Sequence, residues 1–575
     1  MTDFSPPIVD RLKACLAAVY GESSPQRLMP EILSRMQRTA GLLARRPAPP
    51  ALDQRDAILI TYADQFRRPA EKPLHTLAAV CRRIMGIDMS SVHLLPFYPY
   101  SSDDGFSVSD YRQVAPDHGS WEDIAALGQN YRLMFDAVIN HSSVQHEWFQ
   151  RFLQGVAPYD EYYITANPSA DLSAVVRPRA LPLLTRFETA SGPRHVWTTY
   201  SADQVDLNYA NPQVLVEIVD LLLYYLEQGA QFIRLDAIAY LWKETGTTCI
   251  HQPQTHQIIK LLRAVVDAVA PSTALITETN VPHQDNISYF GDGSDEAHLV
   301  YNFALPPLVL HAVQRESSAA LTAWARQLST PSDQTAFFNF LASHDGIGLN
   351  PARGILPDSE IDALVALTRA LGGRINEKSN PDGSTSPYEL NINYYDALGD
   401  PDGRLSEDEH IQRFLLAQSV LLALAGLPGI YVHSLIGSRG WAEGAQVNGH
   451  NRAINRQKLD ADAVLAELDD PGSRRSKIWR GYRRMLSARA AEAAFHPFGR
   501  QEILELDPRV FAVLRTQPNL WRKVICLFNF SRDEIRLPLP GQDQRWLDLI
   551  ADQPDIVSGE LSLRPYERRW LAALV

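Results

Sequence analysis

Two residues of opposite charge interrupt an apolar stretch near the middle of the chain. Phe232 and Ile233 are followed by Arg234 and Asp236. Because side chains alternate between the two faces of a strand, Arg234 and Asp236 should project from one face, about 7 Å apart. Charges on an otherwise buried strand are unfavourable unless they are paired or used. The pair is therefore either a structural ion pair or a carboxylate that an arginine holds ionised for catalysis.

Further polar side chains follow other apolar stretches. Asp136 and His141 end one such stretch, Glu278 ends another, and His344 and Asp345 follow a third. A single buried His or Asp is most often structural, but the convergence of so many polar strand ends is hard to explain in that way. The pattern indicates one site with several carboxylates, two histidines and an arginine.

Paired carboxylates in one cleft support retaining glycosyl transfer, in which one attacks the anomeric carbon and the other protonates the leaving oxygen. The attacking carboxylate must stay ionised, and Arg234 beside Asp236 favours that state. The acid must keep its proton near neutral pH, which suits Glu278 at the end of an apolar stretch. The residue types thus favour Asp236 as the nucleophile and Glu278 as the acid.

Apolar strands that alternate with amphipathic helices would position these residues. The expected strands are residues 57–63, 91–98, 132–140, 231–238, 273–280, 299–305, 337–344 and 429–436. Helical stretches such as 214–229 and 255–270 lie between them. This alternation predicts an α/β fold, a (β/α)8 TIM barrel whose active site lies at the C-terminal ends of the strands.

Other parts of the chain are expected around the barrel. They are an N-terminal helical extension at 1–55, the catalytic barrel at 56–490 with mouth insertions at 145–205 after strand three and at 350–410 after strand seven, and a C-terminal β-sandwich domain at 491–575. Within the extension, apolar residues recur at helical spacing in 8–20 and 30–46. The gaps after strands three and seven are too long for simple crossovers.

The net charge is −13, from 54 basic and 67 acidic residues. This acidic excess argues against a nucleic acid or an anionic membrane as a partner. The cysteines Cys15, Cys81, Cys249 and Cys526 form no CxxC motif, so neither disulfides nor a zinc site is expected. No signal peptide or membrane span is visible. We expect a cytoplasmic protein without a metal or cofactor, and either a monomer or a homodimer.

Four segments together resemble the signature regions of the α-amylase superfamily of glycoside hydrolases and transglycosylases (glycoside hydrolase family 13). They are DAVINH at 136–141, FIRLDAIAY at 232–240, ITETN at 276–280 and FLASHDG at 340–346. The resemblance spans most of residues 56–575. The site residues that it implies are Asp236 as nucleophile, Glu278 as acid/base, Asp345 as transition-state stabiliser, and His141, Arg234 and His344 as ligands of the glucosyl ring.

Within this superfamily, the chain resembles the sucrose-phosphorylase-like group most closely. The segments concerned are RPRALPLLT at 177–185, KETGTTCIH at 243–251, PYELNINYYDAL at 387–398 and NRAINR at 451–456. Starch-hydrolysing amylases usually carry Lys-His shortly after the nucleophile, where this chain has Ala239 and Tyr240. The difference argues against cleavage of long glucans.

The same resemblance implies how the sugar and the second substrate are bound. Asp103 would close the pocket around the sugar's 4-hydroxyl with Arg456, or else with Arg452, and Phe106 and Gln204 are also expected to bind substrate. Arg179 resembles a phosphate-contacting arginine, and a phosphate dianion beside carboxylates does need such a cation. A salt bridge within a loop is the alternative for Arg179. Tyr388 and Glu389 resemble a mobile loop that alternates between phosphate and acceptor.

The helical extension and the segments 60–66, 96–108 and 343–351 resemble glucosylglycerate phosphorylases more than short sucrose phosphorylases. The expected reaction transfers an α-glucosyl unit from a small glucoside, 2-O-α-glucosylglycerate, to inorganic phosphate through a glucosyl-Asp236 intermediate. Its product is α-glucose 1-phosphate. The acceptor glycerate is an anion, so it needs a further basic or amide group, for which Arg374, Lys378 and Arg439 are candidates.

Three alternatives remain open at this point. The substrate could be sucrose, sucrose 6-phosphate or glucosylglycerol, and the reaction could be hydrolysis, which releases glucose whether or not phosphate is present. A binding protein without activity is least favoured, because such a protein would usually have lost one of the three site carboxylates. Asp236, Glu278 and Asp345 are all present here.

Overall fold

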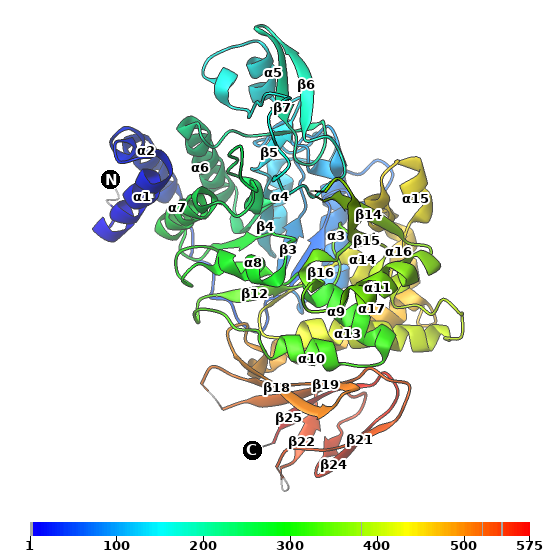
Figure 1. Ribbon diagram of the computed structural model, residues 1–575. Coiled ribbons are helices and arrows are strands. Elements are labelled where there is room, and N and C mark those ends of the chain that lie inside the picture. Colours follow the sequence, from blue (N-terminus) through cyan, green and yellow to red (C-terminus); the bar gives the residue numbers. More distant parts are fainter. Residues whose placement is uncertain (1–3, 381, 520, 542–543, 575) are drawn as a thin grey trace.

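The computed structural model describes residues 4–380, 382–519, 521–541 and 544–574. The residues outside it are 1–3 of the predicted extension, 381 of the second predicted insertion, and 520, 542, 543 and 575 of the predicted C-terminal domain. Figure 1 shows a central barrel, two N-terminal helices packed on one side of it, and an antiparallel β domain at the end that carries the C-terminus.

The strands expected from the sequence form one closed, eight-stranded barrel, as predicted. In chain order they are β1 (Ile58–Thr61), β3 (Ser91–Leu94), β4 (Arg132–Ala137), β9 (Ala230–Leu235), β10 (Ala274–Thr277), β11 (Leu299–Tyr301), β12 (Ala336–Asn339) and β16 (Leu427–Tyr431). Neighbouring strands are parallel, and β1 closes the ring by pairing with both β3 and β16. Ile58, Leu59 and Ile60 are all buried, because both faces of a parallel strand are covered.

Helices cover the outside of the barrel. They are α3 (Pro73–Met85), α4 (Trp121–Gly128), α6 (Pro212–Glu227), α7 (Pro253–Val269), α8 (His283–Ile287), α9 (Leu305–Arg315), α10 (Ala319–Ala325), α13 (Glu407–Ala423), α14 (Val432–Leu435), α16 (Ala461–Asp469) and α17 (Arg474–Ala491). Proline opens α3, α6 and α7, where its missing N–H costs no hydrogen bond. Across the described ranges, no helix combines the length and the hydropathy that a membrane crossing requires.

The N-terminal helices α1 (Pro6–Tyr20) and α2 (Ser24–Leu43) pack against α7 and α6. Helix α2 begins earlier than the predicted residue 30, and Pro30 lies inside it. Proline at that position forfeits one hydrogen bond. The buried side chains Met29 and Ile32 lie on either side of Pro30, so packing against the barrel keeps the helix continuous.

The mouth insertions consist of short strands and helices. After β4 come β5 (His141–Ser143), α5 (Glu147–Leu153), β6 (Leu184–Thr189), β7 (Gly192–Trp197) and β8 (Gln204–Asp206); after β12 come β13 (Ile347–Gly348), α11 (Asp358–Ala370), β14 (Arg374–Ser379), β15 (Thr385–Asn391) and α12 (Tyr394–Ala397). Figure 1 shows the β6–β7 hairpin projecting beyond the barrel. A backbone bridge between Arg177 and Ser379 joins the two insertions.

Short segments complete the mouth. They are β2 (Phe66–Arg67), which pairs with β17 (Leu459–Asp460), helix α15 (Ala442–Val447), and the single-turn helices η1 (Asp103–Gly105), η3 (Ile238–Tyr240) and η6 (Asn451–Asn455).

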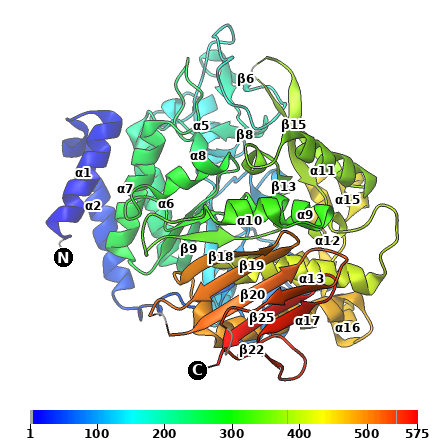
Figure 2. The ribbon, with the colours of Figure 1, turned by 60° about the horizontal axis from the view of Figure 1, so that its bottom comes forward.

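The C-terminal domain is a two-layer antiparallel β structure, in agreement with the predicted sandwich. Its larger sheet has the order β18 (Arg500–Asp507), β19 (Val510–Thr516), β20 (Lys523–Asn529), β25 (Arg568–Ala573), β22 (Trp546–Asp548) and β23 (Ile556–Val557), and its smaller sheet pairs β21 (Ile535–Pro538) with β24 (Glu560–Leu563). Along β19, Val510 and Ala512 join a core within the domain, whereas Phe511 and Val513 join the core of the barrel. Figure 2 shows the larger sheet against the barrel helices.

Gly426, immediately before β16, lies very close to the backbone of the neighbouring strand β12. Gly426 has φ +123°, and a Cβ atom there would lie 2.3 Å from the carbonyl oxygen of Phe337. We expect Gly426→Ala to lower the free energy of unfolding by roughly 2–4 kcal/mol, because it adds a steric clash to backbone strain. The control Gly229→Ala has φ +101° but no atom within 4 Å of its Cβ. Thermal unfolding of both variants compares the costs, and equal losses would contradict the clash.

Candidate active site

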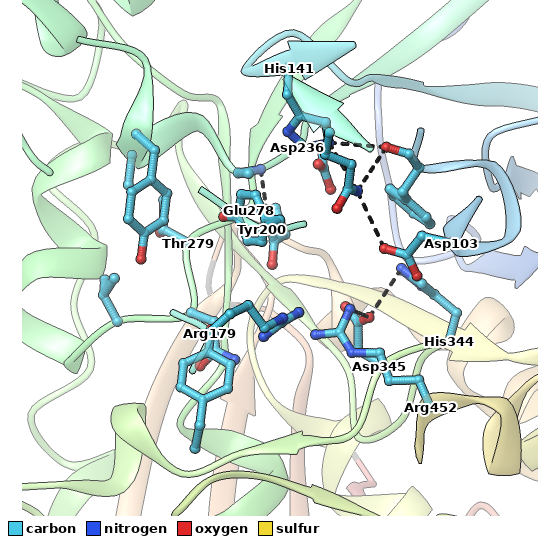
Figure 3. A pocket seen from close by; sticks show the side chains of 18 residues that line it. Asp103, His141, Arg179, Tyr200, Asp236, Glu278, Thr279, His344, Asp345 and Arg452 are labelled. Carbon is cyan, nitrogen blue, oxygen red and sulfur yellow. Dashed lines mark hydrogen bonds and ion pairs between the residues drawn. The ribbon is translucent and has the colours of Figure 1, made fainter. Parts of the chain in front are cut away.

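A pocket at the carboxyl ends of the barrel strands gathers most of the predicted site residues (Figure 3). Those that line it are Asp103, Phe106, His141, Arg179, Gln204, Asp236, Glu278, His344, Asp345, Tyr388 and Arg452. Three other predicted residues, Arg234, Arg456 and Glu389, are buried beside the pocket. They contact the pocket residues with their charged groups.

Arg234 is the centre of the carboxylate cluster. Its side chain is only 2% exposed; Nη1 lies 2.7 Å from Oδ1 of Asp236 and also contacts Asp136, and Nη2 lies 3.8 Å from Oε2 of Glu278. Asp136 also pairs with His93, with 2.6 Å between Oδ2 and Nε2. Asp136 lies beside Arg234 in the register of β4 and β9, a relation between strands that the sequence alone did not reveal.

Burial governs the proton affinity of the two central carboxyl groups. It raises the pKa of Asp236 to about 6, against the opposing charge of Arg234 and with a further rise from Asp136. It raises the pKa of Glu278 to about 7, again against Arg234. Arg234 therefore favours the ionised state as expected, but does not restore an ordinary pKa. The negative charge of Asp236 raises the pKa of Glu278 further, so an ionised Asp236 favours a protonated Glu278, as a nucleophile and an acid require.

The chain turns sharply after β9 and fixes Glu278 in doing so. Ala237 has φ +50°, in the left-handed region, and its N–H donates a 3.0 Å hydrogen bond to Oε2 of Glu278. The short helix η3 follows and places Ala239 and Tyr240 in the pocket wall. The residues that replace the Lys-His of amylases thus lie next to the carboxylates.

Two histidines form opposite parts of the pocket wall. Nε2 of His141 lies 3.0 Å from the carbonyl oxygen of Phe106, to which Gln204 Nε2 also donates at 3.1 Å. The ring of Phe106 stacks on His344, with centroids 4.6 Å apart and 4° between the planes. Burial lowers the pKa of His141 and, helped by Arg456 and Arg234, that of His344. Both imidazoles are therefore neutral at neutral pH.

Asp103 reaches the pocket from a strained turn. Asp103 and Asp104 have φ +53° and +48°, and Gly105 follows with φ +110°. Arg456 Nη1 lies 2.9 Å from Asp103 and 3.0 Å from Asp104, and its Nε donates to the carbonyl of His344 at 2.9 Å. Burial would raise the pKa of Asp103, but Arg456 holds it well below its usual range. Of the two arginines considered as its partner, Arg456 is the one in contact.

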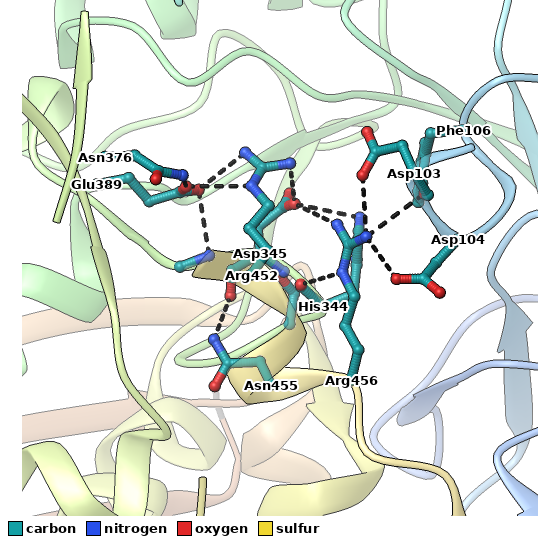
Figure 4. Close-up of polar contacts among 12 residues, drawn as sticks. Asp103, Asp104, Phe106, His344, Asp345, Asn376, Glu389, Arg452, Asn455 and Arg456 are labelled. Atoms are coloured by element: carbon teal, nitrogen blue, oxygen red, sulfur yellow. Dashed lines mark hydrogen bonds and ion pairs between the residues drawn. The ribbon is translucent and has the colours of Figure 1, made fainter. Parts of the chain in front are cut away.

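Arg452 links Asp345 to Glu389 (Figure 4). Its Nη1 lies 2.5 Å from Oδ1 of Asp345, and its Nη2 and Nε donate to the two carboxylate oxygens of Glu389 at 2.9 and 3.1 Å. Glu389 also accepts the N–H of Gly346 at 3.1 Å and the amide of Asn376 at 3.0 Å. It is fully buried on β15.

The expected part of Glu389 in a mobile substrate-contacting loop stays a prediction. Its carboxylate accepts hydrogen bonds on both oxygens and does not line the pocket. The sequence could not show this, because the partners of Glu389 come from β14, the β13 turn and η6, which are distant along the chain. Tyr388, its neighbour, does line the pocket.

Arg179 enters the pocket from the first insertion (Figure 3). Its guanidinium lies over the rings of Tyr200 and Tyr388, with centroid distances of 5.6 and 5.5 Å. Its Nη1 donates to the carbonyl of Pro178 at 3.3 Å. Within the described part of the chain, no carboxylate lies within ion-pair distance of Arg179, so the loop salt bridge considered above is not formed.

The three acceptor candidates lie outside the pocket. Arg374 Nη1 donates to the carbonyl of Ala445 at 3.2 Å, Arg439 lies 4.0 Å from Asp396, and Lys378 is half-buried on β14. None of the three lines the pocket. Pocket residues that the sequence did not single out are Tyr200, Thr279, Asn280 and Val281. Thr279 and Asn280 belong to the ITETN segment, so their place after Glu278 could have indicated them.

A buried ammonium group supports the wall behind His141. Nζ of Lys243 lies 2.7 Å from Oδ2 of Asp206 and 3.0 Å from Oδ1 of Asn140, and it also contacts the carbonyl of Tyr240. The side chain is 1% exposed. Lys243 thus joins the first insertion to the turn that follows the nucleophile.

Comparison with known proteins agrees with this geometry. The family described as alpha amylase, catalytic domain, matches residues 62–348, and the chain belongs to the α-amylase family. It is similar to a glucosylglycerate phosphorylase from Spirochaeta thermophila, with 52% identity over 97% of this chain and 95% of the relative. A second glucosylglycerate phosphorylase, from Escherichia coli, is 46% identical over 97% and 98% of the two chains.

The structure of a sucrose 6F-phosphate phosphorylase from Thermoanaerobacter thermosaccharolyticum has the same fold. It aligns with a TM-score of 0.74 and 20% identity over 88% of this chain and 99% of that chain. The family match and the two full-length relatives confirm the resemblance found in the sequence motifs, and the chain is a glycosyl-transferring enzyme of the α-amylase family.

The pH dependence of turnover follows from the two carboxyl groups. Activity should fall as the pH drops through about 6, because protonated Asp236 cannot attack. It should also fall as the pH rises through about 7, because ionised Glu278 cannot donate. A plot of kcat/KM against pH should therefore be bell-shaped. A profile that keeps rising into alkaline solution would contradict the role of Glu278.

Glu389 pairs with Arg452, and Arg452 contacts Asp345. Removing the charge of Glu389 therefore tests whether this link holds Asp345 in position. We expect Glu389→Gln to lower kcat by about 10- to 100-fold, the cost of a charge-assisted hydrogen bond, with a smaller change in KM. The control is Glu377→Gln, which changes an exposed glutamate on β14 of the same hairpin. Steady-state kinetics and thermal unfolding separate positioning from misfolding. An unchanged kcat in a folded Glu389→Gln variant would refute this support.

Proposed function

We propose that the chain is a retaining α-glucoside phosphorylase. It transfers a glucosyl unit from 2-O-α-glucosylglycerate to inorganic phosphate and gives α-glucose 1-phosphate and glycerate. The names of the two full-length relatives support this substrate. The observation that carries the phosphate part is Arg179, a pocket cation that no carboxylate of the described residues neutralises.

In the first half-reaction, the carboxylate of Asp236 attacks the anomeric carbon while Glu278 protonates the leaving oxygen. Arg234 orients Asp236 through its 2.7 Å contact. Asp345, held by Arg452, stabilises the positive charge that develops on the sugar ring. In the second half-reaction, phosphate attacks the same carbon from the side that the glycerate left, so the α configuration is kept.

The remaining wall residues fit a single glucosyl ring. We assign the 4-hydroxyl to Asp103 and Arg456, which pair across the inner end of the pocket. His141, Gln204 and His344 offer polar groups to the other hydroxyls, and Phe106 presents a ring face beside His344. Such a closed end takes one sugar unit at a time, which suits a small glucoside better than a long glucan.

A cytoplasmic location completes the proposal. All four cysteines are free and buried, as is usual for a protein of a reducing compartment. We also propose that the predicted division into extension, barrel with two insertions, and C-terminal domain holds in solution.

Phosphate release from glucose 1-phosphate tests the function. The enzyme is incubated with this donor and with glycerate, glycerol, fructose or fructose 6-phosphate, and we expect the fastest release with glycerate. Asp236→Asn should lower the activity by about 10³-fold or more, because it removes the nucleophile. The control Asp117→Asn, an exposed surface change, should leave the activity unchanged. No release with any acceptor, or formation of free glucose alone, would refute phosphorolysis. Faster release with fructose would favour a sucrose phosphorylase.

A further inference from the structure

Arg179 is arranged to bind an anion at the edge of its guanidinium. The aromatic rings of Tyr200 and Tyr388 lie against it at 5.6 and 5.5 Å, which suits the faces of the planar group. A guanidinium carries five N–H donors in its plane, and the hydrogen bond to Pro178 uses one of its nitrogens. The remaining edge is directed into the pocket (Figure 3).

The other cations near the pocket are already neutralised. Arg452 pairs with Asp345 and Glu389, Arg456 with Asp103 and Asp104, and Arg234 with the carboxylates around the nucleophile. Within the part of the chain that the structure describes, Arg179 alone of the lining cations lacks such a partner. Any anion that reacts in this pocket therefore meets one available positive group.

The proposed reaction nevertheless involves two different anions. Phosphate takes the glucosyl unit in one direction, and glycerate takes it in the other. We propose that Arg179 binds both in turn, so that it selects 2-hydroxycarboxylates as the class of acceptor. This inference rests on the function proposed above and extends it to the acceptor.

The chemistry of the two anions makes one binding group sufficient. In phosphate, the charged oxygens are two bonds from the attacking oxygen, across the phosphorus atom. In glycerate, the carboxylate is on the carbon that carries the attacking 2-hydroxyl, so its oxygens are three bonds away. A planar, bidentate donor such as Arg suits either group. In an acid whose hydroxyl is one carbon further from the carboxylate, the charged group would not reach Arg179 while the hydroxyl attacks the anomeric carbon.

The transfer to glycerate balances without any further reactant. The oxygen of the 2-hydroxyl forms a bond to the anomeric carbon, and the bond from that carbon to Asp236 breaks. The electron pair of the broken bond returns to the Asp236 carboxylate, and the hydroxyl proton passes to the carboxylate of Glu278. Arg179 holds the acceptor's own carboxylate throughout and exchanges no proton.

The test uses α-glucosyl fluoride as the donor, because it loads Asp236 with glucose and brings no phosphate to Arg179. Phosphate, glycerate, glycerol and water then compete for the glucosyl group, and the products are quantified. In Arg179→Gln we expect transfer to phosphate and to glycerate to fall together, each by about 10- to 100-fold relative to glycerol and water. Arg186→Gln, an exposed change in β6 of the same insertion, is the control and should keep the normal partition.

A second measurement needs only the unaltered enzyme. Lactate and 3-hydroxypropanoate are isomers with the same charge, and only lactate carries its hydroxyl next to the carboxylate. We expect lactate to be the better acceptor by about tenfold or more. Equal use of the two isomers would overturn the proposal, and so would a variant that loses phosphate transfer but keeps glycerate transfer. Failure of the proposed function would give a third, different result, because the unaltered enzyme would then release only glucose from the fluoride.

Discussion

A buried guanidinium holds the carboxylates of this barrel mouth together. Arg234 contacts Asp136 and Asp236 and lies 3.8 Å from Glu278. Three acids so close would repel one another and retain their protons without a cation among them. Because Arg234 is itself secluded from water, its charge is costly unless those acids surround it. The cluster is thus mutually dependent, and the pKa values of nucleophile and acid are properties of the whole group.

A second set of charges extends this arrangement to the insertions. Arg456 joins the strained turn at Asp103 to the backbone of His344, and Arg452 joins Asp345 to Glu389. Each arginine comes from the segment around η6, far along the chain from its partners. The strands therefore supply the reactive groups, while the later segments hold them in position through buried ion pairs.

The sequence predicted what depends on local pattern. Apolar runs and the alternation of side chains were enough to place Arg234, Asp236 and Glu278 at the ends of neighbouring strands of a barrel, and the motif resemblance suggested the role of Asp345. What depends on pairing between distant segments was not predictable. Asp136 meets Arg234 only through the register of two strands, and the hydrogen-bond partners of Glu389 lie on other elements. The start of α2 was misplaced because burial outweighed the local effect of Pro30.

The ammonium group of Lys243 affects how far the wall of the sugar site depends on ions in the surrounding solution. It fills a cage of oxygen atoms from Asp206, Asn140 and Tyr240, next to the wall of the sugar site. Oxygen cages of this kind commonly hold dissolved cations, whose occupancy varies with their concentration. Here the positive charge is covalently part of the polypeptide. Its stoichiometry is one for every chain, and neither dilution nor a chelator can extract it.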